Sequence, residues 1–77
     1  MDDMETLRLN KEVAEGILRE VRANPSSPYA GKVVGIANGQ VVLVGDELSE
    51  TLRRLREIEP NQLRGCCFEP SRPAEYV

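Results

Sequence analysis

Apolar residues recur every three or four positions in two stretches of the chain, which predicts two amphipathic helices. The first helix is expected over 10–23, with Asn10 as its N-cap and Asn24-Pro25 after its end. Its apolar positions are Val13, Ala14, Ile17, Leu18 and Val21. The second is expected to begin at Asp46, its N-cap, and to end before Pro60. Its apolar stripe comprises Leu48, Leu52, Leu55 and Ile58.

Between these helices, Asn38-Gly39 separates two strand-like runs, 32–37 and 40–44. Asn-Gly suits a type I′ turn, because both central residues of that turn need positive φ. A β-hairpin with a two-residue loop is therefore predicted. Its register would pair Ala37 with Gln40, Ile36 with Val41, Gly35 with Val42, Val34 with Leu43, and Val33 with Val44.

This hairpin would be apolar on both faces, so both faces need cover. One face would carry Val34, Ile36, Val41 and Leu43. The other would carry Val33, Gly35, Val42 and Val44, flanked by Ala37 and Gln40. We expect this second set to be a self-association face, covered by another copy of the chain.

A short third strand is expected over 64–69, with Cys66 and Phe68 on one face and Cys67 on the other. A right-handed crossover through the second helix would make it parallel to the second strand, beside the first. The predicted fold is a small two-layer α+β domain, helix-strand-strand-helix-strand. Its three-stranded sheet has order 2-1-3, with both helices on one face. The alternative places one helix on each face.

The 77 residues have room for one small domain. We expect a flexible N-terminal arm over 1–9, a single α+β domain over 10–70 and a C-terminal tail over 71–77. The first residues are acidic, and no apolar run has the length of a membrane span. These features favour a cytoplasmic protein without membrane association, whose two cysteines stay reduced.

Charge and composition argue against several classes of function. Ten basic and thirteen acidic side chains give a net charge of -3, so the chain lacks the positive field of most nucleic-acid-binding proteins. The basic run Arg53, Arg54 and Arg56 lies within reach of Glu50 and Glu57 on the same helix. The absence of histidine removes the commonest general base and metal ligand. We expect no enzyme activity, cofactor or metal.

Four residues remain as candidates for a ligand or redox role. Cys66 and Cys67 are adjacent, which is the wrong spacing for a zinc site, and on a strand they would point to opposite faces. Tyr29 and Lys32 flank the start of the hairpin and could line a shallow ligand surface. For the cysteines, the commoner outcome is one thiol in the core and one at the outer face. For the other two, it is Tyr29 packed on the sheet edge and Lys32 extended along the surface.

The stretch 29–46 reads YAGKVVGIANGQVVLVGD. It resembles a family of short prokaryotic domains of unknown function. These domains have a Tyr-x-Gly-Lys strand, an Asn/Asp-Gly hairpin, a Val-Val strand and a glycine before an amphipathic helix. The resemblance implies the strand-strand-helix-strand order and brings no activity. The family usually has an apolar-basic-apolar pattern in its third strand, where this chain has Cys66-Cys67.

The function predicted from these observations is a non-catalytic, homo-oligomerising protein-interaction module, with a homodimer as its expected state. The first alternative is an accessory or antitoxin-like partner of a neighbouring enzyme or toxin, which would use the sheet edge or the tail. A thiol-dependent enzyme and a nucleic-acid-binding protein are weaker alternatives.

Overall fold

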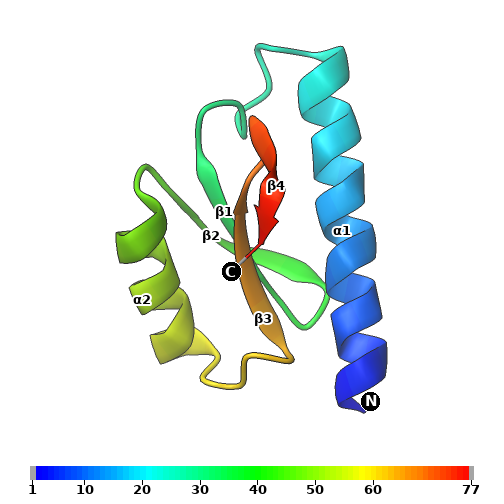
Figure 1. The fold of residues 1–77 in the computed structure, drawn as a ribbon, viewed down its shortest axis with the longest axis vertical. Coiled ribbons are helices and arrows are strands. Elements are labelled where there is room, and N and C mark those ends of the chain that lie inside the picture. The colour runs from blue at the N-terminus through cyan, green and yellow to red at the C-terminus, as the bar shows by residue number, and fades with distance from the viewer. Residues whose placement is uncertain (1, 77) are drawn as a thin grey trace.

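Two helices and two β-hairpins make up the fold (Figure 1). The computed structural model describes residues 2–76, with residues 72–76 described by their backbone. The elements are α1 (Asp3–Ala23), β1 (Val33–Ala37), β2 (Gln40–Gly45), α2 (Leu48–Ile58), β3 (Gly65–Glu69) and β4 (Arg72–Tyr76). The sheet order is β2-β1-β3-β4, and β1 is antiparallel to both β2 and β3. The α+β class and the order β2-β1-β3 are therefore confirmed, with β3 parallel to β2 as expected.

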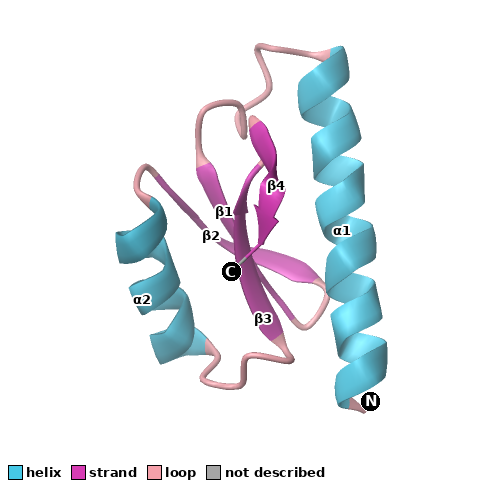
Figure 2. Ribbon diagram, viewed as in Figure 1, coloured by secondary structure: helices cyan, strands magenta, loops and turns pink. Residues whose placement is uncertain are grey.

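The two helices lie on opposite faces of the sheet (Figure 2). Val34 and Ile36 belong to the core cluster that α1 covers, together with Phe68 of β3. Val33 and Ala37 belong to a second cluster, which Leu55 of α2 covers. The prediction that both helices pack on one face is thus wrong, and the alternative of one helix on each face is correct. The reason is that β1 is buried along its whole length, so both of its faces need a cover.

The hairpin has the predicted turn and part of the predicted register. Asn38 and Gly39 have φ values of 53° and 78°, as a type I′ turn requires. The pairs Ala37–Gln40 and Ile36–Val41 are confirmed, but a β-bulge then shifts the remaining pairs by one residue. They are Gly35–Leu43, Val34–Val44 and Val33–Gly45.

The shifted register follows from the space that Gly35 leaves on the α2 side. A Cβ atom at Gly35 would lie 3.2 Å from Leu43 Cβ and 3.6 Å from Leu55 Cδ1. The bulge at Val42 therefore brings Leu43 across from a residue without a side chain, where Leu43 packs in the α2 cluster. Leu43 was expected on the other face, with Val34.

Helix α1 begins seven residues earlier than predicted. Asp2 is its N-cap, and the Asp2 carboxylate accepts a hydrogen bond from the Glu5 amide at 2.8 Å. Residues 3–9 are thus helical, so the predicted flexible arm over 1–9 is wrong for these residues; residue 1 lies outside the described residues. The buried stripe does continue through this part, but its members there are the polar residues Thr6 and Asn10, which a search for apolar periodicity misses.

Asn10 is an interior residue of α1 rather than its N-cap, and its side chain is 1% exposed. Its Oδ1 atom accepts a hydrogen bond from the Gly39 amide at 2.7 Å, and its Nδ2 atom donates to the Arg64 carbonyl oxygen at 2.9 Å. The Asn38 amide donates to the same carbonyl oxygen at 3.0 Å. One side chain therefore joins α1 to the β1–β2 turn and to the residue before β3.

Two further boundaries differ from the predictions. Residues 72–76 form β4, which pairs with β3, where a tail over 71–77 was expected; residue 77 lies outside the described residues. A strand was not predicted here, because this segment contains Pro73 and its apolar and polar residues do not alternate. The N-cap of α2 is Glu47, not Asp46, because the Asp46 carboxylate instead pairs with Lys32 Nζ.

Replacing Asn10 with alanine should lower the free energy of unfolding by about 2–3 kcal/mol, because the Gly39 amide loses its acceptor and the cavity is not refilled. Urea unfolding followed by circular dichroism measures this change. Lys11→Ala, at the next and exposed position of α1, is the matched control and should change stability by less than about 0.5 kcal/mol. Equal stabilities of the two variants would contradict the role assigned to Asn10.

Candidate functional site

The four residues predicted to form a self-association face do not form one surface. Val33 is 2% exposed and packs in the α2 cluster, and Gly35 is buried beside Leu43. Val42 and Val44 of β2 are 38% and 44% exposed. The predicted face is thus divided, because α2 covers the part on β1 and the bulge changes the direction of the β2 side chains.

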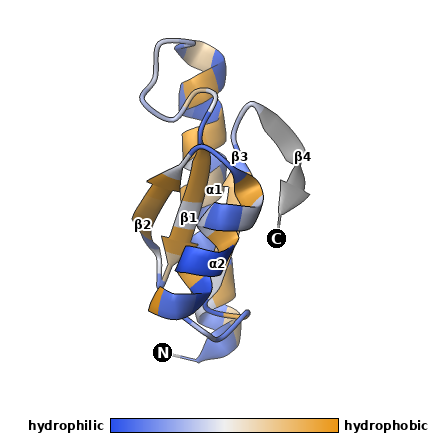
Figure 3. Ribbon diagram, turned by 90° about the vertical axis from the view of Figure 1, so that its left-hand side faces the viewer, coloured by the Kyte–Doolittle hydropathy of each residue, from blue (hydrophilic) through white to orange (hydrophobic). Residues whose placement is uncertain are grey.

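What remains exposed is an edge of the sheet. β2 is the terminal strand of the order β2-β1-β3-β4, and among residues 2–76 only β1 pairs with it. Figure 3 shows β2 as an apolar strand at the margin of the fold, beside the more polar α2. An edge strand presents unpaired amide and carbonyl groups, and a strand from another chain can pair with them.

The edge carries two features that limit indiscriminate pairing. The bulge at Val42 interrupts the regular ladder of β2, and bulges at sheet edges commonly restrict strand addition. The exposed ion pair between Lys32 and Asp46 lies beyond the Val44 end of the strand. Between these features, Leu43–Gly45 keeps a regular register with β1, and Val44 projects from that segment.

The two cysteines point to opposite faces, as predicted. Cys66 is half-buried against the α1 cluster that contains Phe68, whereas Cys67 is fully buried in the α2 cluster. Burial raises the pKa of the Cys66 thiol, and burial together with the neighbouring Cys66 raises the pKa of Cys67 to about 11. Both thiols are therefore protonated near neutral pH, and the thiolate needed for nucleophilic or redox chemistry is scarce.

The side chains of Tyr29 and Lys32 make separate contacts. Tyr29 is partly buried against the α1 cluster. The Lys32 ammonium group donates a hydrogen bond to Asp46 Oδ1. This ion pair joins the residue before β1 to the residue after β2. The two side chains thus contact other parts of the fold, Tyr29 by packing and Lys32 by its ion pair.

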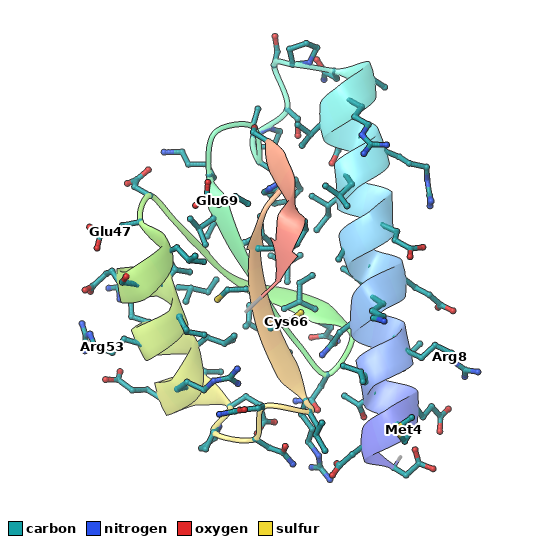
Figure 4. All side chains as sticks on the ribbon, in the orientation of Figure 1. Met4, Arg8, Glu47, Arg53, Cys66 and Glu69 are labelled. Atoms are coloured by element: carbon teal, nitrogen blue, oxygen red, sulfur yellow. The ribbon has the colours of Figure 1, made fainter. Side chains whose placement is uncertain are left out.

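The arginines of α2 are engaged within the chain. Arg53 donates hydrogen bonds to Glu50 Oε1 at 2.8 Å and to Glu57 Oε1 at 3.3 Å, and the hydrogen bond that Glu50 accepts raises the pKa of Arg53. Arg56 points back and donates to the Gly65 carbonyl oxygen at 3.3 Å. In Figure 4, Arg53 projects from the outer side of α2, where acidic neighbours offset its charge.

A shallow hollow lies at the start of α1. Its lining residues, Asp2, Met4, Glu5 and Arg8, all come from the first turns of this one helix and its cap. Enclosed binding sites usually form between elements, so this hollow does not have the construction of a catalytic pocket. Across the described residues, no group of three or more potential ligands is placed to hold a metal ion.

Comparison with protein-family models, with curated proteins and with solved structures finds no match for this chain. The resemblance of 29–46 to a family of short prokaryotic domains therefore stays a prediction. Neither helix within residues 2–76 has the length and hydrophobicity needed to cross a bilayer.

The sequence indicated part of this site. The order β2-β1-β3 already places β2 at an edge, and Val42 and Val44 were among the predicted residues. The structural role of Asn10 was missed. The signal that could have found it is the spacing of Thr6, Asn10 and Ala14, which continues the buried stripe of α1 toward the N-terminus.

Both native thiols should react slowly with iodoacetamide at pH 8, because the attacking species is the thiolate. We expect slow labelling of Cys66 and no labelling of Cys67 before unfolding, with both labelled readily in urea. Peptide mass spectrometry measures each site. Rapid labelling of either native thiol would contradict this expectation.

The raised pKa of Cys67 also predicts the direction of a pH effect on stability. Between the ordinary thiol value of 9.0 and about 11, the unfolded chain loses the Cys67 proton and the folded chain keeps it. The free energy of unfolding should therefore fall as the pH rises through this range. Urea midpoints of the wild type and of Cys67→Ala test this, and an equal pH dependence in both would contradict it.

Proposed function

We propose that this protein is a non-catalytic interaction module that forms a homodimer by antiparallel pairing of the β2 edges of two copies. The observation that carries the proposal is the position of Val42 and Val44, which are 38% and 44% exposed on an edge strand. A partner strand would cover these side chains and satisfy the outer backbone groups of β2.

A second copy is the occupant that this edge favours. Two identical edges related by a two-fold axis pair antiparallel, so one contact satisfies both copies at once. Face-to-face stacking on the central strand is blocked, because α1 and α2 already cover the two faces of β1. Pairing at the edge leaves both helices in place and needs no rearrangement of either core.

The chemistry of the side chains supports a non-catalytic role. The chain has no histidine, and burial keeps Cys66 and Cys67 in the protonated form near neutral pH. The carboxylates Glu50 and Glu57 are used to pair Arg53. The proposal includes a cytoplasmic setting, where cysteines that form no disulfide stay reduced.

Sedimentation equilibrium of the wild type at micromolar concentrations should show a dimer. Val44→Lys should weaken association by roughly tenfold or more, because it places a charge where the paired strands would meet. Ile58→Lys is the matched control, because Ile58 is an apolar residue that is 54% exposed at the end of α2 and is not part of β2, and this variant should dimerise like the wild type.

Circular dichroism must show that both variants are folded. A wild-type monomer at high micromolar concentration would overturn the proposal. Equal association of the wild type and Val44→Lys would also overturn it, because the contact would then lie elsewhere. Stable capture of a different protein by a monomeric chain would instead favour the accessory-partner alternative.

A further inference from the structure

The turn between β1 and β2 contains Asn38-Gly39, the only Asn-Gly pair in the chain. Asparagine followed by glycine is chemically labile, because glycine has no side chain to shield its amide nitrogen. That nitrogen can attack Cγ of the asparagine side chain once it has lost its proton. The rate of this attack depends on how freely the Gly39 amide and the Asn38 side chain can move.

Both groups are held in the folded protein. The Gly39 amide, which would supply the nucleophile, donates a hydrogen bond to Asn10 Oδ1 at 2.7 Å, and Asn10 is 1% exposed. The Asn38 side-chain Nδ2, which would leave, donates to Glu59 Oε1 at 3.1 Å. The backbone amide of Asn38 also donates a hydrogen bond, to the Arg64 carbonyl oxygen.

We propose that Asn38 is a modification site that deamidates when the contact between α1 and the β1–β2 turn opens. The hydrogen bond from the Gly39 amide to Asn10 keeps this contact closed in the native protein. In the open state, solvent base removes the Gly39 amide proton, and the nitrogen attacks Asn38 Cγ. The N–Cγ bond forms, the Cγ–Nδ2 bond breaks and ammonia leaves with a proton from water. One water molecule then opens the cyclic imide to aspartate or isoaspartate.

The product would lose the hydrogen bond that Asn38 makes to Glu59 at the protein surface. A carboxylate at position 38 has no proton to donate to Glu59 Oε1 and would repel that carboxylate. The isoaspartyl form also adds a methylene to the backbone of a two-residue turn, which alters the register of the hairpin. Once the contact has opened and Asn38 has deamidated, the new carboxylate or the altered turn would therefore oppose its reclosure.

The first test compares the full chain in native buffer with the same chain unfolded in urea, at one mildly alkaline pH and one temperature. Intact-mass and peptide-mapping spectrometry follows the replacement of NH by O at Asn38 and separates the two products. We expect the native rate to be lower by roughly tenfold or more, because the reaction must wait for opening. Equal rates in the two conditions would overturn the proposal.

The second test assigns the protection to Asn10. At a temperature where circular dichroism shows both variants folded, Asn10→Ala should deamidate at Asn38 several-fold faster than the wild type, and Lys11→Ala should match the wild type. A folded Asn10→Ala with the wild-type rate would overturn the role of Asn10. If Asn10→Ala does not fold, hydrogen exchange of the wild type decides: a protected Gly39 amide supports the proposal, and random-coil exchange overturns it.

Discussion

The fold depends on one buried carboxamide. Asn10 is far from both of its partners in the sequence, yet it accepts from the Gly39 amide and donates to the Arg64 carbonyl oxygen. Burying a polar group is favourable only when its hydrogen bonds are made, and here both ends of the side chain are satisfied. This requirement sets the distance between α1 and the hairpin turn. It also places the residue before β3 beside that turn, so β3 begins in register with β1.

A central strand covered on both faces explains how so short a chain forms a core. Alternate residues of β1 serve two separate clusters, one under α1 and one under α2. Each cluster is small, and Leu55 is the single α2 residue that is both apolar and fully buried. Burial of such a side chain contributes about 2 kcal/mol. The stability of the domain is thus divided between two thin layers that share β1, and loss of either helix would expose one face of it.

Local signals explain what the sequence predicted well. The type I′ turn at Asn38-Gly39, the two helices and the order β2-β1-β3 follow from turn chemistry, periodicity and crossover rules. The errors arise where tertiary contacts decide. A polar stripe residue, Asn10, was interpreted as a helix cap, and the bulge depends on packing between Leu43 and Leu55 across Gly35. The candidate edge was therefore predicted in part, since the burial of Val33 depends on the face that α2 covers.

The two margins of the sheet differ in a way that bears on how far an assembly can extend. β4 forms the margin opposite β2 and contains Pro73, a residue without an amide proton that sheets tolerate only at their borders. A sheet with two equivalent margins could add copies without limit and grow into a filament. In the proposed dimer, the two β2 margins would pair with each other, and the margins left free would be the two β4 strands, each with Pro73. The asymmetry would thus make the proposed assembly a closed pair rather than an open-ended polymer.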